Sequence, residues 1–281
     1  MAKAGKKGAS SQPDFATIGG LLLAVGGILA GFMMEGGKVQ EITQVTAALI
    51  VLGGTVGAVM ITTPLNVLIR AAKQIGSVVF GKVHPMEATI EEIVECASVA
   101  RKNGIVSLEQ QAATIGDPFL RKALNLAVDG IEAERIREIM ELEITVFEQH
   151  SEAEAKVFEA AGGYAPTIGI IGAVLGLIEV MKNLANIDEV GRGIAVAFVA
   201  TIYGVASANI VFLPVANKLK ARAKETVHVR ELMLQGVLSI AEGLNQKLIR
   251  VQLEAYAHGS KPAKSTKAKE AAAGQPAAAE G

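Results

Sequence analysis

Four runs of about twenty apolar residues constrain this chain more than any other feature. They cover residues 15–34, 42–61, 164–181 and 194–213, and Glu179 is the single charged residue within them. A helix needs about 20 such residues to cross the hydrocarbon core of a bilayer. A soluble protein with buried helices is the alternative, but two pairs of nearly uncharged runs of this length argue against it. The sequence therefore predicts an all-α membrane protein with four transmembrane helices in two pairs.

The distribution of Lys and Arg predicts how these spans are oriented. The two short connections, residues 35–41 and 182–193, carry only Lys38, Lys182 and Arg192, whereas the other ends of the spans are rich in both residue types. Positive charge near span ends marks the cytoplasmic side. Both termini and the long segment between the pairs are therefore expected in the cytoplasm, and the first run, about full membrane length, is expected to be a retained span rather than a signal peptide.

This orientation gives a domain plan. The expected parts, in order, are a cytoplasmic N-terminus (1–14), the first transmembrane pair (15–61), a cytoplasmic helical domain (62–163), the second transmembrane pair (164–213), a cytoplasmic helix (214–258) and a disordered tail (259–281). The tail is rich in Ala, Lys, Pro and Gly, a composition that cannot bury enough apolar surface to fold.

Start and stop signals predict several helices outside the spans. Pro64 ends the second span, and residues 65–80 after it form an amphipathic pattern typical of the membrane surface. Residues 86–103 form a helix that ends at Asn103-Gly104, and Asp117-Pro118 begins another. Residues 132–161 are predicted as a long charged helix that continues into the third span, and residues 218–256 as one further amphipathic helix.

Composition excludes several classes of function. The formal net charge of -1 argues against nucleic acid as a partner. Cys96 is the single cysteine and the four histidines show no ligand spacing, so no metal site is indicated. No phosphate loop, nucleophile elbow or dinucleotide fingerprint is present. The chain is therefore not expected to be an enzyme or to hold a cofactor.

The spans lack the groups that normally carry protons through a membrane. Proton relays use Asp, Glu or His deep in a helix bundle, whereas the deep polar residues here are Thr46, Thr55, Thr201, Ser207 and Asn209. A hydroxyl bonded to the preceding helical turn is the ordinary alternative to a functional one. If this chain conducts ions, another chain is expected to supply the carboxylate and this chain the wall. Glu179, near the outer end of the third span, either lines the ion entrance or reaches the outer surface beside Lys182.

Two prolines lie at the cytoplasmic ends of the second pair. Pro166 and Pro214 each lack an N–H and obstruct the carbonyl one turn earlier, which kinks a helix. They are interpreted either as hinges at the membrane surface or as mere helix starts or bends, and the residues alone leave both open.

Two stretches carry a resemblance to a known family. They are APTIGIIGAVLGLIEVMKNL (165–184) and GRGIAVAFVATIYGVASANIVFLPVANKLK (191–220). Together with the two pairs of spans around a large cytoplasmic segment, they resemble the MotA/PomA family of flagellar stator proteins within the wider MotA/TolQ/ExbB group. The resemblance covers roughly residues 15–256. ExbB and TolQ, which energise outer-membrane transport, have three spans and are the alternative.

The resemblance implies an assembly and a location. Family members form a homopentamer in the bacterial inner membrane, surrounded by lipid, around two copies of a MotB-type partner. Each partner has one span with an essential Asp and a domain that binds peptidoglycan. Ion passage past that Asp turns the ring, whose cytoplasmic parts push on the rotor protein FliG.

The resemblance also implies contacts with the rotor. A cytoplasmic Arg and a Glu eight residues later contact the rotor in this family, and they correspond to Arg101 and Glu109 in ARKNGIVSLE. Two solvated surface charges are the alternative. Lys102, Arg121 and Lys122 are neighbouring candidates for the same role.

Within the spans, the resemblance implies four further positions. Pro166 and Pro214 match prolines implicated in torque generation, and Thr201 matches the hydroxyl residue that faces the partner's Asp. Sodium-driven members carry a further Thr in the third span, where this chain has Ala173. Because dehydrated Na⁺ requires several oxygen ligands, the alanine predicts coupling to protons.

Overall fold

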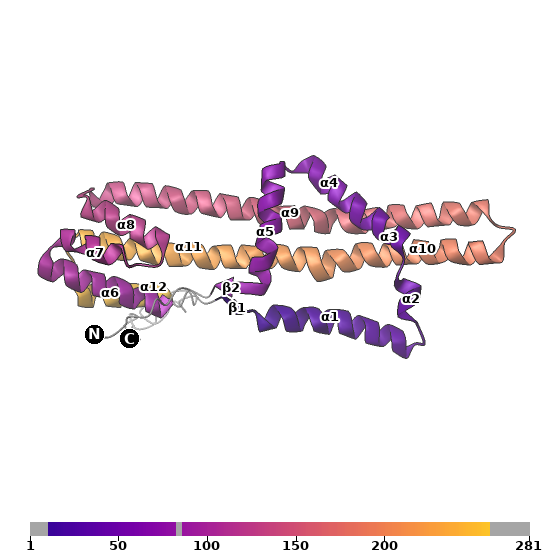
Figure 1. Ribbon diagram of the computed structural model, residues 1–281, viewed down its shortest axis with the longest axis horizontal. Helices are drawn as coiled ribbons and strands as arrows, with labels where there is room; N and C mark the ends of the chain where they lie inside the picture. The colour runs from indigo at the N-terminus through magenta and orange to yellow at the C-terminus, as the bar shows by residue number, and fades with distance from the viewer. Residues whose placement is uncertain (1–10, 83–85, 259–281) are drawn as a thin grey trace, which may run out of the picture. The chain divides into compact units, whose positions relative to one another are not determined.

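The computed structural model describes residues 11–82 and 86–258, which are mainly helical (Figure 1). The elements before the long helices are β1 (Ser11–Pro13), α1 (Phe15–Met34), α2 (Val39–Ile42), α3 (Val45–Ala48), α4 (Gly54–Thr62), α5 (Leu65–Val79), β2 (Phe80–Lys82), α6 (Met86–Asn103), α7 (Leu108–Ala112) and α8 (Pro118–Val128). The remaining elements are α9 (Ala133–Lys182), α10 (Ile187–Ala206), α11 (Leu213–Ala241) and α12 (Gln246–His258).

Four helical segments in the part of the chain that the structure describes are long and apolar enough to cross a membrane, as predicted. They are Phe15–Met34, Val39–Thr62, Ala133–Lys182 and Ile187–Ala241. The last two are longer than a bilayer requires, because α9 runs for 50 residues and α10 passes through a π-helical segment, Ser207–Phe212, directly into α11. The prediction that the charged helix before the third span continues into it is confirmed.

The first two spans differ in regularity. α1 is a regular helix in which no residue is buried, and the Asp14 carboxylate caps it by accepting a hydrogen bond from the N–H of Thr17 (3.1 Å). The second span is interrupted at Thr43 and Gln44, which are extended, and contains a π-helical segment, Leu49–Gly53. It ends before Pro64, from which α5 departs.

The chain divides into two compact units. The first contains residues 11–82 and 143–227. Its apolar core lies where α5, α9 and α11 meet the end of the second span and includes Val59, Ala71, Val78, Phe158, Ala161, Ala216 and Leu219. A second cluster joins the second and fourth spans through Ala47, Val51, Val199 and Ala200, with Tyr203 packed against it. Residues Ser11–Pro13 also pair antiparallel with Phe80–Lys82.

The second unit contains residues 86–142 and 228–258. It consists of α6, α7, α8 and α12 with the first part of α9 and the last part of α11. Its largest fully buried side chains are Ile93, Leu108, Phe119, Leu120, Leu124, Ile136, Met140, Leu232, Met233, Leu238, Ile249 and Leu253. Two predicted signals are confirmed here, because α6 ends at Asn103 before Gly104 (φ 85°), and Asp117 caps α8 ahead of Pro118.

One predicted helix is two helices in the structure. Residues 218–256 were expected to be continuous, but α11 ends at Ala241 and α12 begins at Gln246. Gly243 adopts a φ of 74°, which favours glycine, and Asn245 accepts a hydrogen bond from the N–H of Lys247 (3.1 Å) at the start of α12. The predicted tail, 259–281, and residues 1–10 of the predicted N-terminus lie outside the described residues.

Candidate functional sites

The third and fourth spans cross along a seam of glycine and alanine. A Cβ added to Gly204 would lie 2.6 Å from the carbonyl oxygen of Ala165, and one added to Gly176 would lie 2.8 Å from both the Ala197 nitrogen and the Gly193 oxygen. These neighbours are backbone atoms, so no side chain can rotate away. Small residues allow helices to approach this closely in a membrane, and the seam fixes α9 against α10.

Thr201 and Ala173 lie beside this seam. A Cβ built on Gly169 would lie 3.5 Å from Thr201 Cα. Gly169 is one helical turn before Ala173 on α9. Both residues are half-buried in the single chain. The Thr201 hydroxyl donates to the carbonyl oxygen of Ala197 (3.1 Å), so its oxygen remains able to accept a hydrogen bond.

Thr55, by comparison, has its side chain buried within the single chain. Its side chain is 1% exposed, and its hydroxyl donates to the carbonyl oxygen of Val51 (2.6 Å) next to the π-helical segment. Of the polar residues noted in the spans, Ser207 and Asn209 likewise bond to the preceding turn, at the carbonyl oxygens of Gly204 and Val205.

Pro166 lies in the interior of a helix, and Pro214 is the second residue of α11, which continues from the preceding π-helical segment without a break. Pro166 lies inside α9, and its Cα would be 3.2 Å from a Cβ on Gly204, so it sits at the tightest part of the seam. Pro214 follows the π-helical segment Ser207–Phe212 within one continuous helical run. Each proline removes one hydrogen bond from its helix. Of the interpretations left open by the sequence, a bend or a hinge remains.

A tyrosine ties the interrupted second span to the fourth, which sequence reasoning missed. The Tyr203 hydroxyl donates to the carbonyl oxygen of Ile42 (2.6 Å) and accepts from the backbone N–H of Gln44 (3.3 Å). These two backbone groups flank the break between α2 and α3 and would otherwise lack helical partners. The available signal was the tyrosine itself, since a hydroxyl within an apolar span requires a polar partner.

Glu179 is exposed at the end of α9. Its carboxylate lies 3.7 Å from Lys182 Nζ and accepts a hydrogen bond from Asn183 Nδ2 (2.9 Å). In the single chain Glu179 therefore lies beside Lys182.

Ion pairs gather where α1, α5, α9 and α11 leave the spans. The Asp14 carboxylate pairs with Lys218 (2.5 Å) and Arg222 (3.0 Å) of α11. The hydrogen bond from Lys218 is the largest cause that holds the pKa of Asp14 well below its usual range, with the Thr17 N–H and Arg222 adding to it. Two further pairs, Lys220–Glu159 (2.6 Å) and Arg70–Glu154 (3.4 Å), join α11 and α5 to α9.

In the second unit, Arg101 and Glu109 lie on either side of the Gly104 turn. Arg101 is in the last turn of α6 and Glu109 in the first turn of α7, and both are exposed. Among the residues that the structure describes, neither makes an ion pair or a side-chain hydrogen bond. Arg121, by contrast, donates two hydrogen bonds to the carbonyl oxygen of Ile115, from Nη2 (2.8 Å) and Nε (3.2 Å), so its side chain is held within the second unit.

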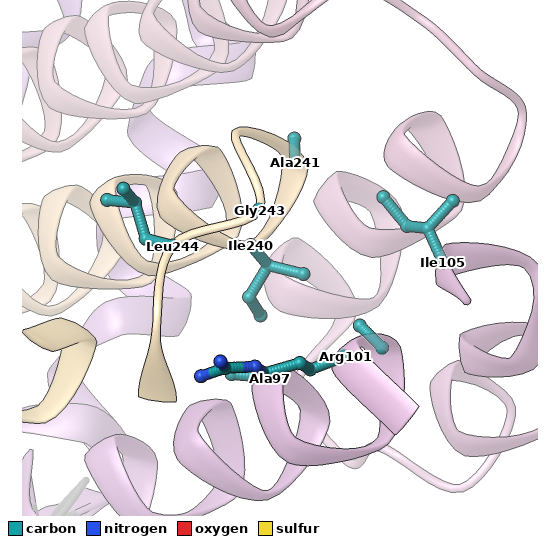
Figure 2. A pocket seen from close by; sticks show the side chains of 8 residues that line it. Ala97, Arg101, Ile105, Ile240, Ala241, Gly243 and Leu244 are labelled. Atoms are coloured by element: carbon teal, nitrogen blue, oxygen red, sulfur yellow. The ribbon is translucent and has the colours of Figure 1, made fainter. Parts of the chain in front are cut away.

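A hollow of about 250 Å³ adjoins Arg101. Figure 2 shows Arg101 and Ala97 of α6 on one side, with Ile240 in the last turn of α11 and Gly243 in the turn after it on the other. The lining residues are Ala97, Ala100, Arg101, Ile105, Ile240, Ala241, Gly243 and Leu244. The turn between α11 and α12 therefore forms part of the surroundings of Arg101. Within residues 11–82 and 86–258, no group of three metal-ligating side chains is present.

Comparisons with known proteins cover nearly the whole chain. Residues 111–232 match the model of the MotA/TolQ/ExbB proton channel family, and residues 18–103 match that of the motility protein A N-terminal region. Motility protein A of Bacillus subtilis (strain 168) is 38% identical over 247 residues, which are 86% of this chain and 90% of that protein.

Two solved structures are similar to this chain as well. A chain of the C. jejuni MotAB structure matches with a TM-score of 0.84 and 32% identity, covering 90% of this chain and 99% of that one. A chain of the flagellar MotAB stator complex from Bacillus subtilis matches with a TM-score of 0.80 and 36% identity, covering 89% of this chain and 100% of that one.

Proposed function

The chain belongs to the MotA/TolQ/ExbB proton channel family, and we propose that it is a stator subunit of a bacterial flagellar motor. With a MotB-type partner it forms an ion channel that converts ion-motive force into torque on the rotor. The observation that carries this proposal is the match of about nine tenths of the chain to chains of two solved MotAB structures. It is a transport and motor role rather than an enzymatic one.

The alternative, an ExbB- or TolQ-like subunit that energises outer-membrane transport, has less support. Residues 18–103 match the N-terminal region of motility protein A, and residues 11–82 and 86–258 contain four candidate spans rather than three.

The ion path is proposed to run along the α9–α10 seam and to use a carboxylate from the partner. Glu179 is the only acidic residue in the four apolar runs, and it pairs with Lys182 at the end of α9. Thr201 supplies a hydroxyl oxygen beside the seam, whereas Ala173 supplies none. Since Na⁺ requires several oxygen ligands after it loses water, the coupled ion is proposed to be the proton.

Torque is proposed to pass through the two prolines. Pro166 lies where the backbones of α9 and α10 touch, and Pro214 lies next to a π-helical segment. Both positions lack a helical hydrogen bond, so bending there costs less than in a regular helix. The two prolines are therefore proposed as the hinges through which ion passage moves the spans.

Arg101 and Glu109 are proposed to contact the rotor protein FliG. Both are exposed and lie on adjacent helices at one turn. Charges in such positions steer association and fix register more than they add affinity, which suits a contact that must form and break repeatedly.

The proposed assembly is a homopentamer around two MotB-type partners in the bacterial inner membrane. Lipid surrounds the spans, consistent with α1, which has no buried residue in the single chain. Lys218, Lys220 and Arg222 follow the fourth span, and this positive charge supports a cytoplasmic location for the helical parts and both termini.

The test is motility in a strain that lacks the gene, with the gene restored as wild type, Arg101→Glu or Arg135→Glu. Arg135 is an exposed arginine whose partner, Glu138, is on the same helix, so it serves as the matched control. Cells are expected to grow filaments but not swim without the gene, and to swim with wild type and Arg135→Glu but poorly with Arg101→Glu. Normal swimming of the deletion strain, once any redundant stator genes are also removed, would refute the motor role.

The ion is tested in the restored strain. Swimming speed is expected to fall with a protonophore and to be independent of external Na⁺. Speed that follows external Na⁺ and ignores the protonophore would exclude coupling to protons.

A further inference from the structure

The C-terminal helix α12 folds back onto the helix that carries Arg101. After the turn at Gly243, α12 packs its fully buried residues Ile249 and Leu253 into the second unit. A Cβ on Gly236 of α11 would lie 2.7 Å from Ile93 of α6 and 3.4 Å from Leu253. Three helices, α6, α11 and α12, therefore meet at one apolar contact.

Apolar contacts alone leave the register of such helices weakly specified, and polar contacts fix it here. On the α6 side, Arg250 of α12 donates to the Glu91 carboxylate from its two terminal nitrogens, Nη1 (2.5 Å) and Nη2 (2.7 Å), and lies 3.6 Å from Glu254. The hydrogen bond from Arg250 is the main cause that lowers the pKa of Glu91. A two-bond guanidinium–carboxylate contact sets relative position as well as distance.

On the α11 side, a hydrogen bond holds α12, because the Tyr256 hydroxyl donates to Glu231 (2.7 Å). The Ser239 hydroxyl donates to the carbonyl oxygen of Gln235 (2.9 Å) within α11 and lies 3.3 Å from the side-chain oxygen of Gln252. α12 is thus attached to both of its neighbours by specific polar contacts, and among the side chains that the structure describes the Arg250–Glu91 contact is the one that links it to α6.

Glu91 and Arg101 lie on the same helix, ten residues and therefore about 15 Å apart along its axis. α6 is a single rigid element between them, so a contact that fixes Glu91 also fixes the end that presents Arg101. That end borders the hollow formed with the turn that leads into α12.

We propose that Arg250 is a positioning residue, which fixes α6 against α12 through Glu91 and so determines how Arg101 is presented to the rotor. The proposal rests on the proposed contact between Arg101 and the rotor. The pair is partly exposed (37% and 63%), so it adds little to global stability. Its loss should therefore shift or loosen α6 while Ile249 and Leu253 keep the unit folded.

The experiment compares wild type with Arg250→Glu and with the charge swap Glu91→Arg plus Arg250→Glu. Arg135→Glu again serves as the control, because its exposed pair lies within one helix. Hydrogen exchange of α6 amides is measured on the full-length assembly purified from membranes in detergent, and swimming is measured in cells. Arg250→Glu should raise the exchange of α6 by about threefold, the size expected for an exposed ion pair, and reduce swimming without lowering the amount of assembly.

The swap should restore both readouts, and the control should change neither. Unchanged exchange of α6 in Arg250→Glu, or a swap that fails to restore it, would overturn the proposal. If Arg250→Glu does not accumulate, Arg250→Lys retains the charge without the two-bond contact, and its exchange should lie between wild type and threefold; wild-type exchange would again overturn the proposal.

Arg101→Glu, tested in parallel, separates the two proposals. If that variant swims normally, the proposed contact between Arg101 and the rotor is wrong. The hydrogen exchange of α6 in the Arg250 variants still reports whether Arg250 fixes α6 through Glu91.

Discussion

Replacing Gly204 by alanine should weaken the packing of the third and fourth spans. The new Cβ would lie 2.6 Å from the carbonyl oxygen of Ala165 and 3.0 Å from Gly169 Cα, whereas ordinary contact begins at 3.4 Å. Both neighbours are backbone, so the helices must separate by about 0.8 Å. Overpacking of this kind costs about 1–3 kcal/mol, and alanine returns about 1 kcal/mol through its higher helix propensity. The net loss relative to wild type is about 0–2 kcal/mol, or a fall of roughly 0–8 °C in apparent Tm. Relative to a Gly→Ala change that meets no neighbour, the loss is about 1–3 kcal/mol.

Thermal unfolding of the assembly in detergent checks this, with swimming as the second readout. Gly163→Ala in α9 and Gly191→Ala in α10 are the matched controls, because a Cβ at either position meets nothing within 4 Å of this chain. Both controls should unfold at or slightly above the wild-type temperature. If Gly204→Ala unfolds at the same temperature as the controls, the third and fourth spans are not in backbone contact at Gly204.

Three further changes have defined outcomes. Tyr203→Phe leaves two backbone groups of the second span without a partner and should lower the free energy of unfolding by about 1–2 kcal/mol, measured by thermal unfolding. The control is Tyr164→Phe, because the Tyr164 hydroxyl makes no hydrogen bond among the described residues; this variant should lose no measurable stability. Asp14→Asn should destabilise the assembly at pH 7. Pairing lowers the pKa of Asp14 in the folded state, so the stability that the ionised carboxylate contributes is complete above the ordinary carboxyl pKa and is lost as pH falls towards the lowered value. The difference in stability between Asp14→Asn and wild type should therefore shrink below about pH 4. Ala173→Thr alone should neither abolish swimming nor make speed depend on external Na⁺, which titration of Na⁺ in a swimming assay would detect.

Features governed by local sequence could be predicted. The four spans follow from apolar length, and Pro64, Asp117 and Gly104 act through their own backbone or side chain within one turn. The break between α11 and α12 was also encoded locally, in Gly243 and Asn245, but the amphipathic pattern continues across it and concealed the stop.

Contacts between distant segments could not be predicted from one sequence. Nothing near Asp14 indicates that its carboxylate meets Arg222, 208 residues away, and nothing near Tyr203 indicates Ile42 as its partner. Candidate site residues were found through family motifs, which identify positions but not their surroundings. The glycine seam beside Thr201 and the hollow beside Arg101 depend on how helices cross, which the periodicity of a single helix does not contain.

The glycine contacts of the spans also determine which substitutions this chain can accumulate during evolution. At Gly204 and Gly176 an added methyl group meets backbone atoms, so selection should remove substitutions by alanine. At Gly162 and Gly54 the obstacle is a side chain: Leu213 Cδ2 and Cγ would lie 2.6 and 2.7 Å from the new Cβ, and Ile168 Cγ2 would lie 2.8 Å from it. A side chain can change its rotamer, which backbone cannot, at a cost that is higher for β-branched Ile168. Alanine should therefore be more frequent at these two positions than at the other two among functional variants of this chain, even though all four look alike in the sequence.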